Sequence, residues 1–243
     1  MNVSGHTTAF FRRSANAFAV RSVFRFSQGQ LLVALVVLFA AVPFFDNLVW
    51  GGEAVLTVLL TLVMGSALLA VGGRKGAMVG GIFLILPAIA LRVVPHFTGV
   101  LYDNPVALAC RGLFIAFTVW QLLRFVLRAQ RVTGEVLCAG VSIYLLMGLL
   151  WSSIYLLDAA LIPGAFRQSA SALHLAPFTF SESFYFSFCA LTTANYGDII
   201  PVSHFARQHA IMESVTGVLY VAILIARLIT LYSATAAASA EKE

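Results

Sequence analysis

Residues 192–198 read Thr-Thr-Ala-Asn-Tyr-Gly-Asp, a polar and turn-prone heptad between two apolar stretches. A short aromatic-rich run at 181–192 leads into it, and a long apolar run at 208–232 follows it. Backbone N–H and C=O groups at membrane depth find no water. An irregular segment is therefore tolerated there only where it lines a water-filled cavity or is buried in protein. This order of segments decides how the rest of the chain is interpreted.

The composition is that of a polytopic membrane protein. Of the 243 residues, 60% are hydrophobic and only 10% are charged, and the mean hydropathy is +0.94. This balance excludes an ordinary soluble globular domain. A spanning helix needs about 20 mostly apolar residues, and the run at 181–192 is too short to cross, so it is predicted to be re-entrant. The candidate spans are 30–47, 54–72, 76–94, 105–127, 133–158 and 208–232.

The basic residues predict the orientation of these spans. With six spans and the N-terminus in the cytosol, ten basic residues fall in cytosolic segments and only Arg92, Arg167 and Arg207 fall outside. The positive-inside rule therefore predicts both termini in the cytosol. The net charge of +5 reflects this bias and does not indicate a nucleic-acid partner. The ten cytosolic residues are Arg12, Arg13, Arg21, Arg25, Arg74, Lys75, Arg124, Arg128, Arg131 and Lys242.

A half-helix, the pattern Thr-x-x-Tyr-Gly-Asp at 193–198 and a following span together resemble the pore of the tetrameric potassium-channel superfamily, over residues 181–232. The resemblance implies an all-α membrane protein with six transmembrane helices, a re-entrant pore helix and a homotetrameric pore. Filters of this family replace the hydration shell of K⁺ with carbonyl oxygens. One position departs from the family, since Asn195 stands where the first filter glycine normally lies.

The resemblance also assigns roles to single residues of the filter. Gly197 would take the left-handed conformation that turns the Tyr196 carbonyl inward, and the Tyr196 ring would pack outward against Tyr185 and Phe186. Asp198 would close the outer mouth and attract cations. K⁺ is the implied permeant ion, bound by backbone carbonyls and the Thr193 hydroxyl, and no organic cofactor is expected. The implied filter residues are Thr193, Ala194, Asn195, Tyr196 and Gly197.

The pore helix of this resemblance would begin near Ser181 or Ser183, whose hydroxyls could cap it, with Glu182 in its first turn. Its C-terminus would point toward the pore centre, where the negative end of the helix dipole favours a cation. The cap at its N-terminus and the direction of its dipole are therefore the two expectations for this short helix.

Asn195 leaves the degree of selectivity open. The first filter glycine takes a positive φ, which costs most L-residues about 1–2 kcal/mol, and Asn is several-fold enriched in that region. The strand can therefore keep its carbonyl geometry, but four Asn amides in a tetramer must each find a hydrogen-bond partner. The alternatives are a K⁺-selective channel, a weakly selective cation channel, and a non-conducting pore-like membrane assembly subunit.

This interpretation divides the chain into four segments. It also predicts that the protein lies in a bacterial-type inner membrane, in contact with membrane lipid. The outer loop between the fifth span and the pore helix, 159–180, carries turn residues such as Pro163 and Gly164 and is predicted to be irregular. The segments are a cytosolic N-terminal segment at 1–29, a four-helix transmembrane domain at 30–131, a pore domain at 132–233 and a short cytosolic tail at 234–243.

Three residues of the last span invite a functional and a structural interpretation. Gly217 falls where the family places its gating hinge, and close helix packing through a small residue is the equal alternative. Glu213 is ionisable within a span and so a functional candidate, although a hydrogen bond to the pore helix is favoured. Arg227 is expected to reach the inner interface and extend its charge into it.

The remaining polar and thiol side chains carry weaker predictions. Outer histidines could sense protons, but scattered surface histidines are far commoner than sensors. The three cysteines, Cys110, Cys138 and Cys189, are predicted to be buried thiols without a disulfide. No catalytic arrangement is found in the sequence, so an enzyme is not expected. The four histidines expected in outer loops or at helix ends are His96, His174, His204 and His209.

The four-plus-two layout resembles the voltage-gated channel superfamily, but the fourth span lacks a sensor pattern. Steep voltage gating needs about 3–4 charges per subunit within the field, and no charge lies between Arg111 and Arg124. Arg124, Arg128 and Arg131 cluster at the cytosolic end, where anchoring arginines belong.

We therefore expect large voltage steps alone not to gate this protein steeply. The measurement is a conductance–voltage curve of the reconstituted protein. About 12 gating charges per tetramer would produce a steep curve. A curve of that steepness would contradict this prediction.

Overall fold

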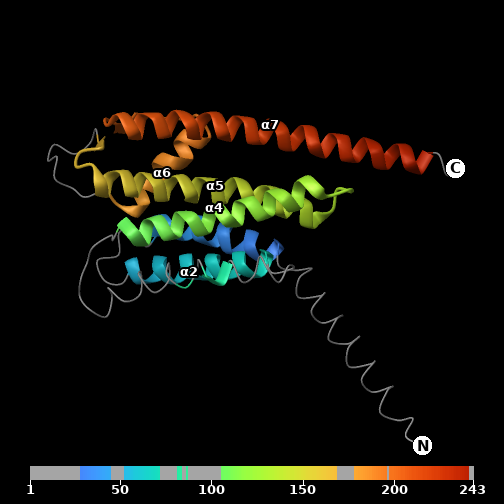
Figure 1. Ribbon diagram of the computed structural model, residues 1–243, viewed down its shortest axis with the longest axis horizontal. Helices are drawn as coiled ribbons and strands as arrows, with labels where there is room; N and C mark the ends of the chain where they lie inside the picture. The colour runs from blue at the N-terminus through green and yellow to red at the C-terminus, as the bar shows by residue number, and fades with distance from the viewer. Residues whose placement is uncertain are drawn as a thin grey trace, which may run out of the picture.

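The computed structural model describes residues 28–44, 52–71, 81–83, 86, 105–168, 178–195 and 197–240. These residues are helical apart from turns and two three-residue strands, in line with the mostly helical fold that the sequence predicts (Figure 1). The elements are a first helix Gln28–Phe44, α2 (Gly52–Val71), α4 (Pro105–Arg128), α5 (Gly134–Leu161), β1 (Phe166–Gln168), α6 (Phe180–Leu191), β2 (Ile199–Pro201) and α7 (His204–Ala240).

Three of the described helices are long and apolar enough to cross a membrane, namely Pro105–Arg128, Gly134–Leu161 and His204–Ser233. They coincide within a few residues with the last three predicted spans. The first helix and α2 lie where the first two spans are predicted. Most of the predicted third span at 76–94 lies outside the described residues, so the count of six spans stays a prediction.

A short turn makes α4 and α5 an antiparallel pair. Only residues 129–133 separate them, and α5 begins at Thr133, whose side chain accepts a hydrogen bond from the Val136 N–H at 3.4 Å. The two helices pack against each other along much of their length, and Figure 1 shows them side by side. α4 is therefore fixed directly to α5, the first helix of the part that carries the Tyr-Gly-Asp segment.

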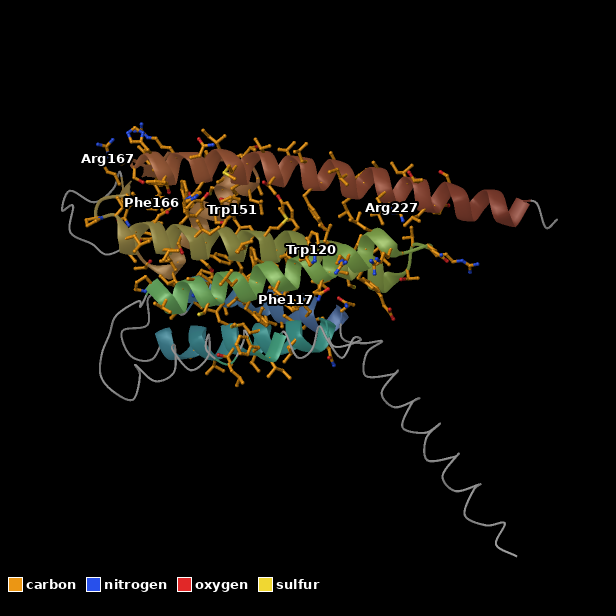
Figure 2. All side chains as sticks on the ribbon, viewed as in Figure 1. Phe117, Trp120, Trp151, Phe166, Arg167 and Arg227 are labelled. Carbon is orange, nitrogen blue, oxygen red and sulfur yellow. The ribbon has the colours of Figure 1, made fainter. Side chains whose placement is uncertain are left out.

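Arg227 on α7 is bound by backbone carbonyls at the end of α4, and its predicted place at the inner interface stays a prediction. Its guanidinium Nη2 donates to the Leu127 carbonyl at 3.1 Å and to the Ala129 carbonyl at 2.9 Å, at the end of α4 (Figure 2). The last carbonyls of a helix have no partner within it and carry partial negative charge. They therefore attract the cation, and the two hydrogen bonds join α7 to the turn between α4 and α5.

The outer loop contains a strand that the sequence did not predict. α5 continues to Leu161, and Phe166–Gln168 then pairs antiparallel with Ile199–Pro201, placing Arg167 opposite Ile200. The Val202 N–H extends this pairing by donating to the Ala165 carbonyl at 2.8 Å. The small sheet therefore joins the end of α5 to the residues that directly follow Asp198.

The core around α6 is built from aromatic rings and one glycine. Phe39 of the first helix packs edge-on against Phe184 and Phe188 of α6, with ring centroids 4.7 and 4.4 Å away. On the α5 side, a Cβ at Gly148 would lie 2.1 Å from the Phe188 ring, so only a glycine admits the ring there. α6 therefore lies between α5 and the first helix.

Replacing Arg227 with Leu should lower the free energy of unfolding by about 1 kcal/mol, because two carbonyls lose a charged donor. Arg131→Leu is the matched control, since Arg131 is exposed on the same turn and has no hydrogen bond in the described residues. Thermal unfolding of both purified variants in the same detergent is the measurement, and equal stability of the two variants would contradict the prediction.

Candidate functional site

α6 begins with a reciprocal cap from Thr179, and the prediction that Ser181 or Ser183 caps it is wrong. The Glu182 N–H donates to Thr179 Oγ1 at 3.3 Å, and the Thr179 N–H donates to Glu182 Oε2 at 2.7 Å. This is a capping box, in which Thr and Glu three residues apart satisfy each other's backbone N–H groups. Ser183 lies a turn inside the helix, where its hydroxyl donates to the Phe180 carbonyl. Glu182 is in the first turn, as expected.

The C-terminus of α6 holds the following segment by backbone hydrogen bonds. The Thr193 N–H donates to the Ala190 carbonyl at 3.0 Å, and the Ala194 and Asn195 N–H groups donate to the Cys189 carbonyl at 2.8 and 3.4 Å. A helix end leaves such carbonyls without internal partners. The polar segment uses them, so its N–H groups are satisfied by the helix that precedes it.

Three of the predicted filter residues have a positive φ. The angles are 59° at Thr193, 27° at Asn195 and 81° at Gly197. The expected positive φ at Asn195 and left-handed conformation at Gly197 are both present. Positive φ at Thr193 was not expected, because for a β-branched residue it is a genuine outlier. Strained backbone of this kind persists only where the surroundings hold it, and it clusters at functional sites.

The filter segment is exposed on this single chain, at 192–195 and at Gly197 and Asp198. Tyr196 lies outside the described residues, so its predicted packing against Tyr185 and Phe186 stays a prediction. The Tyr185 hydroxyl faces Asp198, and a hydrogen bond with this carboxylate raises the pKa of Tyr185 above its ordinary value. Asp198 Oδ1 also accepts the Ile199 N–H at 3.0 Å. A side chain of α6 therefore contacts the acidic residue that ends the predicted filter segment.

α7 contacts the last turn of α6 by means of a glycine and a serine hydroxyl. A Cβ at Gly217 would lie 2.4 Å from the Leu191 carbonyl oxygen. The Ser214 hydroxyl donates to the Ala190 carbonyl at 2.9 Å. Of the two interpretations of Gly217, close packing is present in the structure, and a hinge at this position stays a prediction.

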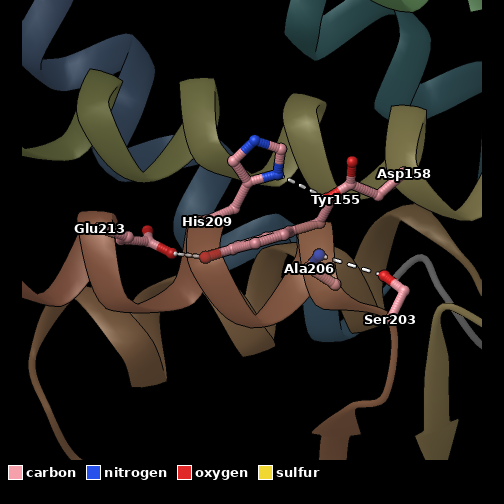
Figure 3. Close-up of polar contacts among 6 residues, drawn as sticks. All are labelled: Tyr155, Asp158, Ser203, Ala206, His209 and Glu213. Atoms are coloured by element: carbon pink, nitrogen blue, oxygen red, sulfur yellow. Dashed lines mark hydrogen bonds and ion pairs between the residues drawn. The ribbon is translucent and has the colours of Figure 1, made fainter.

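Glu213 confirms the hydrogen-bonded interpretation. Its side chain is 0% exposed, and Ser187 of α6 lies 2.6 Å from its Oε1. The Tyr155 hydroxyl of α5 donates to its Oε2 (Figure 3). One carboxyl group therefore joins three helices beside the filter segment.

The histidines and cysteines differ in how they match the predictions. His204 begins α7, and His209 Nδ1 lies 2.8 Å from Asp158 Oδ2 at the α5–α7 contact. His96 and His174 lie outside the described residues. Cys189 is buried, but Cys110 and Cys138 are only half-buried, because their helices leave one face open. All three are free thiols.

Arg111 near the start of α4 is also placed beside the pore helix. Its side chain is 5% exposed, its Nε donates to Ser153 Oγ of α5 at 3.1 Å, and its guanidinium lies 5.6 Å from the centre of the Phe180 ring. A guanidinium over an aromatic face is attracted to it. This buried cation thus packs against the first residue of α6.

Sequence reasoning missed four side chains that hold the site: Tyr155, Thr179, Ser187 and Ser214. Thr179 could have been found from its three-residue spacing to Glu182, which is a helix-start signature. The others are hydroxyl groups on apolar helices. Only the three-dimensional contact with a specific partner distinguishes these hydroxyl groups from the other hydroxyl groups of the helices.

Residues 132–234 match the family model described as an ion channel. This segment is thus similar to ion channel domains, consistent with the potassium-channel superfamily that the sequence resembles. Together with three helices that are long and apolar enough to cross a membrane, this match indicates a membrane protein. No curated protein and no solved structure matches the chain.

Gly217→Ala should lower the free energy of unfolding by about 1–3 kcal/mol, because the methyl group collides with backbone and cannot be relieved by a rotamer change. Gly65→Ala in α2 is the control, since no atom lies within 4 Å of its Cβ position, and there the higher helix propensity of Ala should be neutral or stabilising. Thermal unfolding compares the two. An unchanged stability of Gly217→Ala together with altered channel opening would instead favour the hinge.

Proposed function

We propose that this ion channel domain conducts K⁺ passively across the cell membrane through a filter at Thr193–Asp198. The observation that carries the proposal is the run of positive φ angles at Thr193, Asn195 and Gly197, directly after a half-helix. A backbone that is held in such angles, and not in a helix, can present successive carbonyl oxygens. Oxygen rings of this kind are what replaces the hydration shell of K⁺.

Four copies would share the pore, because one strand cannot surround an ion. The exposed filter residues agree with this arrangement, since they have no covering within the single chain. α7 is also largely uncovered, with apolar side chains such as Ile211, Val218 and Ile225 exposed. In the proposed homotetramer part of this surface contacts neighbouring copies and part contacts lipid. No nucleic-acid partner, organic cofactor or catalytic activity is proposed.

The ion path would be electrostatically favourable to cations at both ends of the filter. The C-terminus of α6 directs the negative end of its dipole toward the filter. Asp198 would place one carboxylate per subunit at the outer mouth, where several like charges concentrate cations. Both termini are proposed to be cytosolic, from the distribution of basic residues in the sequence.

A weakly selective cation channel is the second candidate, and one angle favours it. The φ of 27° at Asn195 lies outside the left-handed region of about +50 to +70°. A carbonyl displaced by that difference would bind a dehydrated K⁺ less well and discriminate less against Na⁺.

The experiment is ion flux into vesicles that contain the purified chain, under a K⁺ or a Na⁺ gradient. Rapid K⁺ flux with little Na⁺ flux is expected. Equal fluxes would favour the weakly selective channel. The absence of any flux, with a tetramer present, would contradict conduction and favour a pore-like assembly subunit.

Asn195→Gly should increase the ratio of K⁺ to Na⁺ flux, because glycine reaches positive φ without steric cost. Asn195→Ala is the matched variant, since it also removes the amide but keeps the Cβ and should not increase the ratio. The reversal potential in mixed K⁺ and Na⁺ solutions is the measurement. Equal ratios in the two variants would show that the amide, and not the backbone conformation, sets the selectivity.

A further inference from the structure

Glu213 lies where three helices meet beside the filter segment. Figure 3 shows its carboxyl directed at Tyr155 of α5, one turn of α7 away from His209. Ser187 of α6 approaches its other oxygen at 2.6 Å. The side chains of Glu213, Tyr155 and Ser187 are all 0% exposed. The state of this carboxyl group therefore affects the contact between α5, α6 and α7.

The contacts of Ser187 need one more donor hydrogen than an ionised Glu213 carboxylate would leave there. Ser187 Oγ lies 2.7 Å from the Gly148 carbonyl oxygen and 2.6 Å from Glu213 Oε1. A serine hydroxyl supplies one hydrogen, and a carbonyl oxygen only accepts. Two such short contacts need two hydrogens. A proton on Glu213 Oε1 supplies the second, so that Glu213 donates to Ser187 and Ser187 donates to Gly148.

The charges around Glu213 agree with this count. In the described part of the chain its hydrogen bonds are to the hydroxyls of Ser187 and Tyr155, and neither is a cation. The nearest histidine along α7, His209, is directed at Asp158 of α5 instead, at 2.8 Å. An ionised carboxylate buried without a paired cation is strongly disfavoured, whereas a neutral acid with both oxygens hydrogen-bonded is tolerated.

The contacts that follow Glu213 along α7 extend its influence to the filter. Ser214 donates to the Ala190 carbonyl, and Gly217 packs on the Leu191 carbonyl. Ala190 also accepts the Thr193 N–H. A change at Glu213 therefore acts on the last two turns of α6, from which the filter segment starts.

We propose that Glu213 is a neutral carboxylic acid that donates a hydrogen bond to Ser187 and thereby positions the pore helix for ion selectivity. The selectivity part of this inference rests on the proposed channel function, whereas the proton on Glu213 does not. Glu213 is a positioning residue, since it acts on the ion through α6 and touches no filter residue in the described structure.

The proton is tested by infrared spectroscopy of the full chain in lipid vesicles at neutral pH. The C=O stretch of a protonated carboxylic acid should be present, should be lost in Glu213→Gln and should shift in Ser187→Ala. Asp158→Asn is the control, and it should leave this band in place. If Glu213→Gln removes carboxylate bands from the spectrum and removes no band of a protonated acid, the proposal is overturned.

The positioning role is tested by the ratio of K⁺ to Na⁺ flux. Glu213→Gln keeps a neutral hydrogen-bonding group of the same shape and should keep the wild-type ratio. Glu213→Leu has a similar size without polar atoms and should lower the ratio by about tenfold. An equal loss in both variants would overturn the role of the neutral acid. A wild-type protein without K⁺ selectivity would contradict the proposed function, while the infrared comparison still decides the proton.

Discussion

The hydrogen bonds between the C-terminal carbonyls of α6 and the N–H groups of the next residues are the interaction on which the filter region depends. Cys189 and Ala190 accept bonds from three of the residues that follow the helix. In a membrane these groups would otherwise have no partner, and each would cost several kcal/mol. The same bonds satisfy the N–H groups of Thr193, Ala194 and Asn195. In the proposed channel, the carbonyls of the segment would then be free to bind an ion.

This arrangement requires α6 to be held in place, and three neighbours do so by different means. On α5, Gly148 has no side chain, so the Phe188 ring packs directly on the helix backbone. α7 supplies hydroxyl and carboxyl contacts at Ser214 and Glu213, and the first helix supplies the Phe39 ring. Close packing admits few alternative positions. The first helix is thus part of the support of α6.

The features that follow from one-dimensional patterns were predictable from the sequence. Apolar length gave α4, α5 and α7, and the tolerance of Asn and Gly for positive φ gave the angles at Asn195 and Gly197. The positive φ of Thr193 was not predictable, because local sterics oppose it, whereas its N–H is bound to the Ala190 carbonyl of α6. The Arg227 contact was equally hidden, since its partners are carbonyl groups about a hundred residues away. Side-chain type does not reveal such partners.

The turn at 129–133 has a consequence for any assembly of several copies. Five residues cannot carry α5 away from α4 to a neighbouring molecule while the two helices pack as a hairpin. In the proposed tetramer, each protomer would therefore keep its own peripheral helices in its own quadrant and would not exchange them. In a mixed assembly, a defect in the peripheral helices would reach the filter strand of the same protomer first. Wild-type and defective protomers would then differ within one ring, and the loss would grow stepwise with the number of defective copies.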